Sequence, residues 1–209
     1  MILGIDPGKT GGGLLVSHRQ AVCAFWWRAR KRKGSTVYDL QCCHADGWER
    51  RVHPLRAPWE VGIAIRTQLS PTLAPHDGVC TVAAESAHIG RNAHTGIALS
   101  RWAGALLAPL ESLDPTCAAA WVEPDEWRAA VLSRGWWKAT ATAHGMAAHR
   151  ATAERLGCGF MQKREAAKLA ALKAVPEHLP NLLDLPIPER ALEHVADAAG
   201  IALWRSGII

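Results

Sequence analysis

The chain has 209 residues, of which 49% are hydrophobic and 21% are charged, a balance that excludes a disordered polyelectrolyte and predicts one sizeable domain with a full core. The net charge of +5 favours a polyanionic partner without identifying it. No apolar stretch approaches the roughly 18 residues of a membrane span, and the N-terminus shows no signal peptide, so we expect a cytoplasmic protein.

The first eight residues form an apolar run that ends on a single carboxylate. Asp6 follows five apolar or glycine residues, and Pro7 and Gly8 come directly after it. An apolar run stopped by turn residues predicts a buried strand, so Asp6 should lie where that strand leaves the core. An Asp-Pro-Gly sequence more often only forms a turn, but a strand end can also hold a carboxylate in a fixed position for chemistry.

The next segments predict two further strands of a meander and then a basic loop. Residues 12–16 and 21–27 have strand character on either side of a short polar turn. Five of the seven residues 28–34 are basic, which is typical of a solvated loop or of a clamp on a nucleic-acid backbone. Residues 35–59 are expected to be irregular.

The six cysteines predict free buried thiols. No Cys-x-x-Cys pair is present, and three of the cysteines lie in apolar, strand-like runs. A zinc site built from Cys42, Cys43, His44 and His53 is disfavoured, because adjacent cysteines do not have the usual ligand spacing.

Two later segments carry acids in comparable places. Residues 79–84 form a second apolar run, which ends on Glu85. Residues 193–204 predict a helix on which His194 and Asp197, three residues apart, share one face. The three acids and the histidine could therefore converge, and carboxylates at the rim of a dry core repel each other unless a divalent metal neutralises them.

The remaining segments are mainly helical in character. Small residues on one stripe of the helix that ends near residue 107 suit either core packing or a dimer interface. The other expected elements are a helix at 59–69, a strand at 115–122, a helix at 123–132, an inserted helix at 133–160, a basic helix at 162–175 closed by Pro176, and a Pro-rich link at 179–188.

These blocks, in this order, resemble the RuvC family of Holliday-junction resolvases, within the RNase H-like superfold. The resemblance is carried by residues 3–8, by residues 84–86 with the helix running to 105, and by residues 194–198; residues 122–128 resemble the Val-x-Pro-x-x-Trp segment of some phage members. It implies an α/β fold with a mixed five-stranded sheet flanked by helices, in the cytoplasm of a bacterium or of a phage-infected host. One domain, 1–209, would carry a basic insertion around 28–58 and a helical insertion around 133–160.

The resemblance also implies a catalytic set. Asp6, Glu85, His194 and Asp197 would bind Mg²⁺, for which Mn²⁺ could substitute, and His194 would either take a metal position or assist proton transfer. Two ions about 4 Å apart can activate the attacking water and stabilise the leaving oxygen. The implied activity is paired nicking of four-way DNA junctions by a homodimer, leaving 5′-phosphates, with the helix at 91–107 as the expected dimer contact.

Several residues are expected to contact DNA. His88 occupies the place where the family often carries an aromatic wedge, which leaves the wedge role open. The other expected DNA contacts are Arg30, Lys31, Arg32, Lys33, Arg91, Lys163, Arg164 and Lys168.

Three alternatives stay open from the sequence. A related RNase H-like nuclease could act on flaps, branched phage DNA or RNA precursors. A phosphotransferase or ATPase of the actin-like fold would use residues 6–11 to hold phosphate, although such folds need two domains and no His194 near Asp197. A junction-binding protein without catalysis is disfavoured by the complete acidic set.

Overall fold

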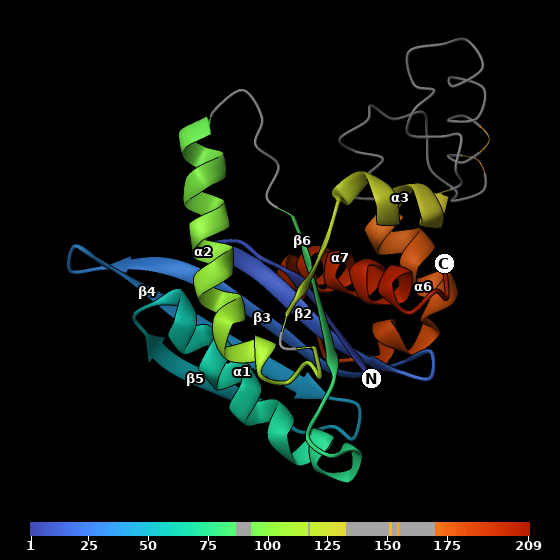
Figure 1. Cartoon of the computed structure of the whole chain (residues 1–209), viewed down its shortest axis with the longest axis horizontal. Coiled ribbons are helices and arrows are strands. Elements are labelled where there is room, and N and C mark those ends of the chain that lie inside the picture. Colours follow the sequence, from blue (N-terminus) through green and yellow to red (C-terminus); the bar gives the residue numbers. More distant parts are fainter. Residues whose placement is uncertain (87–92, 117, 133–150, 152–153, 155–169) are drawn as a thin grey trace.

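The computed structural model describes residues 1–86, 93–116, 118–132, 151, 154 and 170–209, and they form a mixed sheet flanked by helices (Figure 1). The strands are β1 (Ile2–Asp6), β2 (Thr10–Ser17), β3 (Gln20–Arg32), β4 (Ser35–His44), β5 (Glu49–Leu55), β6 (Thr81–Glu85) and β7 (Ala120–Val122). The predicted α/β architecture, a mixed sheet flanked by helices, is confirmed, but the number of strands is not, because the sheet has seven rather than five.

The two additional strands are β4 and β5, in the segment expected to be irregular. Strand β4 pairs with β3 along ten residues, and β5 pairs with β4 at the edge of the sheet. Most side chains of β5 are exposed and it contains Pro54, which an edge strand tolerates because one side of its backbone has no strand partner. An edge strand of this kind lacks the alternating apolar pattern that identifies strands in a sequence.

The basic run is also more ordered than expected, because β3 continues through it. Arg30 pairs with Val37, and Arg32 pairs with Ser35 in β4. The turn between the strands is Lys33-Gly34, with φ of 48° and 82°, the two positive values that a two-residue hairpin turn of type I′ requires. The expectation of a loop from residue 28 is therefore wrong: Arg30, Lys31 and Arg32 belong to the strand, and Lys33 to the hairpin turn.

The order of the strands is β5-β4-β3-β2-β1-β6-β7. Strands β1 to β5 are antiparallel in succession, whereas β6 runs parallel to β1 and β7 runs parallel to β6. In the register of β1 and β6, Ile5 lies beside Ala84. The carboxyl ends of β1 and β6, and with them Asp6 and Glu85, therefore lie at the same edge of the sheet.

The helices cover both faces of the sheet (Figure 1). Helices α1 (Pro58–Leu73) and α2 (Ala93–Glu111) pack on one face, and α7 (Glu189–Arg205) packs on the other. The shorter helical elements are η1 (Ala74–His76), α3 (Pro124–Leu132), η2 (Ala170–Ala174), α6 (Val175–His178) and η3 (Pro180–Asp184). Among the described residues, no helix is long and apolar enough to span a membrane.

Two expectations about the helical segments have different outcomes. Pro176 does not close the preceding helical segment, because it lies in the first turn of α6, where a missing N–H costs nothing. The inserted helix at 133–160 and most of the basic helix at 162–175 fall outside the described residues.

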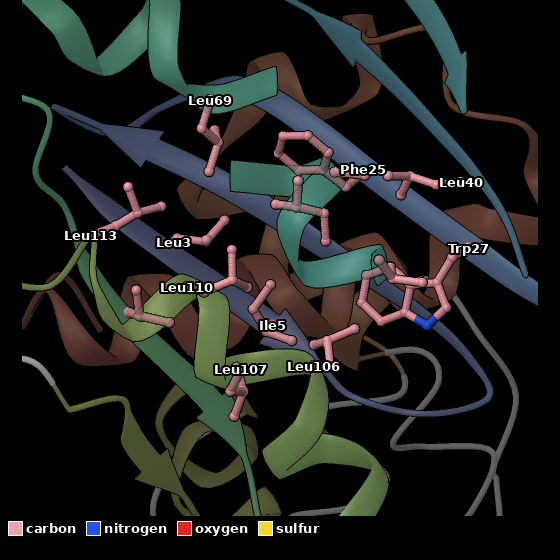
Figure 2. Close-up of a cluster of buried hydrophobic side chains, with 14 of the residues drawn as sticks. Leu3, Ile5, Phe25, Trp27, Leu40, Leu69, Leu106, Leu107, Leu110 and Leu113 are labelled. Carbon is pink, nitrogen blue, oxygen red and sulfur yellow. The ribbon is translucent and has the colours of Figure 1, made fainter. Parts of the chain in front are cut away.

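The sheet separates two hydrophobic cores. Figure 2 shows the core under α1 and α2, where Leu3, Ile5 and Trp27 meet residues of α2 such as Leu106. The second core lies under α7 and combines small and branched side chains with Trp26 and Trp127.

Alternation along β4 settles the position of the adjacent cysteines. Cys42 lies in the core under α1 and α2, and Cys43 in the core under α7, so the two thiols cannot share one zinc ion. Cys23, Cys42, Cys43 and Cys80 are free and buried. Burial raises the pKa of Cys43 and of Cys80 to about 12, which keeps both as unreactive thiols.

Glycines in β1 and β2 allow α7 to lie directly on the sheet. A Cβ at Gly4 would come within 2.0 Å of the Ala198 carbonyl oxygen, and one at Gly12 within 2.6 Å of the His194 carbonyl. The lack of a side chain at these two positions therefore sets the height of α7 above β1 and β2.

We expect Gly4→Ala to lower the free energy of unfolding by about 2 kcal/mol, as overpacking at a rigid backbone contact does. Gly104→Ala is the matched control, because a Cβ there meets no atom within 4 Å and alanine favours the interior of α2 by about 0.5–1 kcal/mol. Urea unfolding of both variants measures the effect. Equal stabilities of the Gly4 variant and the wild type would show that α7 can lift off the sheet without cost.

Candidate active site

Four predicted site residues gather at the edge of the sheet where β1 and β6 end. Asp6 is the last residue of β1, and Glu85 is the last residue of β6. His194 and Asp197 lie one helical turn apart on α7, which crosses over β1 and β2. The close approach of Gly12 to the His194 backbone places this part of α7 above the end of β1.

His194 and Asp6 form a direct pair. The His194 Nδ1 atom lies 2.7 Å from the Asp6 Oδ2 atom, within hydrogen-bond distance. This contact joins residues that are 188 positions apart in the chain. A carboxylate bonded to one ring nitrogen fixes the orientation of the imidazole and favours a proton on that nitrogen.

Glu85 and Asp197 are linked by a residue of α3. The Nη2 group of Arg128 lies 3.3 Å from Glu85 Oε2 and 3.7 Å from Asp197 Oδ2. All three side chains are largely shielded, with exposed fractions of 16% for Arg128, 18% for Glu85 and 15% for Asp197. The guanidinium is therefore the cation that balances these two carboxylates.

Trp127 contacts both Glu85 and Arg128 and holds them in place. Its indole Nε1 donates a hydrogen bond of 3.1 Å to Glu85 Oε2, and the Arg128 guanidinium carbon lies 4.8 Å from the centre of its ring. The indole is fully buried against Gly200 of α7, where a Cβ would approach the ring within 2.4 Å. Glu85 and Arg128 consequently have little freedom to move independently of α7.

The acidic groups influence each other electrostatically. Burial raises the pKa of Glu85; Arg128 opposes this effect, and the charge of Asp6 adds to it. Burial, and then the charges of Asp6 and Glu85, raise the pKa of Asp197 well above its ordinary value, again against Arg128. The three carboxylates thus form one electrostatic set with an unmet demand for positive charge.

We expect Asp197→Asn to raise the Tm of the metal-free protein at pH 7 by about 2–4 °C, the shift that 1 kcal/mol produces in a domain of this size. Because the pKa of Asp197 is higher in the folded than in the unfolded state, ionisation disfavours folding, and this cost grows as pH rises through the interval between the two values. Thermal melts in EDTA from pH 4 to 8 measure it.

The difference between this variant and the wild type should grow with pH and vanish at the acidic end. Asp184→Asn, at an exposed position of η3, is the matched control and should leave the melting curve unchanged. A gain in Tm that is the same at every pH would rule out relief of charge as its cause.

The residue types at this site suit a divalent metal, although Arg128 is the cation that the structure places there. Carboxylate oxygens are the ligands that Mg²⁺ prefers. As the side chains stand, no three acidic, histidine or cysteine groups of the described residues converge closely enough to hold an ion.

Two buried polar atoms at the same place, Arg128 Nε and Ser86 Oγ, have no hydrogen-bond partner within the described part of the chain. Such atoms are rare in folded proteins and mark a place suited to a further polar group.

The expected DNA contacts that the structure describes lie apart from the acidic site. Thr10 pairs with Arg28, so β3 runs on past the sheet edge that carries Asp6, and Arg30 to Lys33 form the far end of that hairpin. These four residues are not part of the acidic site. His88, Arg91, Lys163, Arg164 and Lys168 lie outside the described residues.

Two residues of the site were missed by sequence reasoning, namely Trp127 and Arg128. The available signal was the Val-x-Pro-x-x-Trp pattern at residues 122–128, whose tryptophan and following arginine both contact Glu85. The pattern indicated a resemblance, but only the packing of α3 against β6 and α7 gives its residues a role.

No family model matches the sequence, and no curated protein matches it. Among solved structures, the chain is similar to T. thermophilus RuvC in complex with Holliday junction substrate, with a TM-score of 0.46 and 20% sequence identity over 98% of this chain and 92% of that chain. At this level the likeness is not an argument for function, which has to come from the site itself.

Proposed function

We propose that this chain is a metal-dependent nuclease that hydrolyses phosphodiester bonds in branched DNA. The observation that supports the proposal is that Asp6, Glu85 and Asp197, remote in sequence, lie near one sheet edge, where burial, and then the charges of neighbouring acids, raise the pKa of Glu85 and Asp197. Such a set is costly for a protein to keep unless it binds cations in the course of its function.

In this proposal, Asp6, Glu85 and Asp197 hold Mg²⁺, or Mn²⁺ in its place. When bound, the metal supplies an activated water and stabilises charge on the leaving oxygen. Asp6 also orients the His194 imidazole through the 2.7 Å contact, so that His194 can hold or move a proton beside the scissile phosphate. Trp127 keeps the Glu85 carboxylate in place through its indole N–H.

The preferred substrate is a four-way DNA junction, cut by a homodimer in paired nicks that leave 5′-phosphates. A two-fold dimer presents two equivalent sites and matches the two-fold symmetry of a junction. The basic end of the β3–β4 hairpin, Arg30 to Lys33, would contact the DNA backbone. Helix α2, with Ile97 44% exposed, would supply the dimer contact.

The test is incubation of the purified chain with Mg²⁺ and, in parallel, a labelled four-way junction, a flap and a structured RNA. We expect symmetric nicks in the junction, with 5′-phosphate ends, and little product from the other two. Faster cutting of the flap or the RNA would support the proposed nuclease activity but assign it a different substrate. ATP hydrolysis without any cleavage of nucleic acid would instead favour the actin-like alternative.

A further inference from the structure

A cavity of about 320 Å³ opens beside the acidic site, and His194 is one of its lining residues. It lies where β2 and β3 meet the first turns of α7. Its lining residues are Thr10, Gly11, Trp26, Trp27, Arg28, Arg190, Ala191 and His194. Because His194 both lines the cavity and contacts Asp6, the cavity and the acidic site are separated by one side chain.

The cavity is positively charged. Arg28 of β3 and Arg190 of α7 are both exposed, and neither forms an ion pair with any residue in the described part of the chain. Of the residues that the structure describes, no carboxylate lines the cavity. The N-terminal turn of α7 adds the positive end of its dipole. Glu189 and Glu193 are the acids nearest to Arg190 along α7, and neither lines the cavity, so the two arginines are available to an external anion.

Trp26 and Trp27 also line the cavity, and hydrogen bonds fix both indoles. The Trp26 indole N–H donates to Gln41 Oε1 at 2.9 Å, and the Trp27 indole N–H donates to the Gly8 carbonyl at 2.8 Å. Gly11 leaves room for the Trp27 ring, because a Cβ there would approach that ring within 2.6 Å. Arginines beside rigid aromatic side chains form the combination that binds a nucleotide, with phosphate on the cations and sugar or base on the rings.

We propose that this cavity binds a backbone phosphate of the strand that the acidic site cuts, close to the scissile phosphate, with the adjoining nucleotide against Trp26. The proposal rests on the proposed nuclease function and names the part of the substrate that the site holds. The volume lies at the lower end of the range for ligand sites, about 300–1,000 Å³, and admits one nucleotide of a single strand rather than a duplex. The strand must therefore be unpaired or splayed where it enters, as it is at a branch point.

The test uses the full-length chain carrying Asp6→Asn, which prevents cleavage, and a fluorescent four-way junction. One phosphate at a time along the cut strand is replaced by a neutral methylphosphonate, and Kd is measured over a range of salt. Arg28→Gln and Arg190→Gln are added singly and together, with Arg66→Gln, exposed on α1 and away from the cavity, as the matched control.

Each cavity variant should weaken binding about three- to tenfold and lower the slope of log Kd against log salt by about one, whereas the control changes neither. One methylphosphonate next to the cut site should weaken binding to the parent. The same methylphosphonate should have no further effect on the double variant, because the arginines that contact that phosphate are already absent. Arg28→Lys with Arg190→Lys should retain the salt slope, and unchanged Tm values exclude misfolding.

An equal loss from that methylphosphonate in the parent and the double variant would overturn the proposal, as would cavity variants that bind like the control. In either case, persistent cleavage of junctions by the wild type would leave the nuclease function standing. If the wild type cuts no nucleic acid and the arginine variants bind a single-stranded oligonucleotide as the wild type does, both proposals fail.

Discussion

Asp6→Asn is expected to reduce junction cleavage by about 10³-fold or more while the protein stays folded. Asp6 contacts His194 directly, and its charge acts on both Glu85 and Asp197, so it is the group through which the four site residues are coupled. Metal-ion stabilisation of the transition state is worth several kcal/mol, and each 1.4 kcal/mol corresponds to about tenfold in rate. Asparagine keeps the shape of the side chain and removes the charge that a cation needs.

Single-turnover cleavage of a labelled junction, in Mg²⁺ and in Mn²⁺, measures this effect. Asp184→Asn, which also removes one carboxylate but at an exposed position of η3, should cut at the wild-type rate. Circular dichroism melts should show that Asp6→Asn is not less stable than the wild type, because the variant relieves repulsion on Glu85 and Asp197. Cleavage at equal rates by both variants would remove Asp6 from the mechanism and with it the assignment of the site.

Arg128→Gln is expected to destabilise the metal-free protein by about 3 kcal/mol and to make its response to Mg²⁺ larger. Breaking a buried ion pair from one side costs about 3–5 kcal/mol, and the partial exposure of this group places it at the lower end. With the guanidinium gone, the pKa of Glu85 and of Asp197 rises further, and the ionised carboxylates have no internal cation. A bound Mg²⁺ then no longer competes with Arg128, so we expect its affinity to rise by about tenfold.

Urea unfolding in EDTA measures the loss of stability, and titration calorimetry measures the Mg²⁺ affinity. Neither measurement depends on nuclease activity. Arg128→Lys, which keeps the charge, should restore much of the stability, although a lysine loses the planar contact with Trp127. Arg101→Gln, exposed on α2, controls for the loss of a positive charge in general. Unchanged Mg²⁺ affinity in Arg128→Gln would mean that Arg128 only supports the fold and does not occupy the position of a metal.

The polar residues of β4 and β5 show why these two strands were not predicted from the sequence. Asp39 of β4 is buried, and it is paired with Arg30 at 2.7 Å and with His53 of β5. A charged group in the middle of a strand breaks the apolar pattern that predicts strands, and its compensation comes from two neighbouring strands. Only pairing across the sheet therefore makes residues 35–55 a stable structure.

What the sequence determined by itself is the local placement of the candidate catalytic groups. Apolar runs that stop at Asp6 and Glu85 predict strand ends, and the helical period places His194 and Asp197 on one face, because each pattern depends only on near neighbours in the chain. The tertiary structure decided what surrounds them. Arg128 reaches Glu85 across 43 positions in sequence, and the cavity joins β2 and β3 to α7, because contacts of that range follow from how the sheet and helices pack and leave no periodic trace in the sequence.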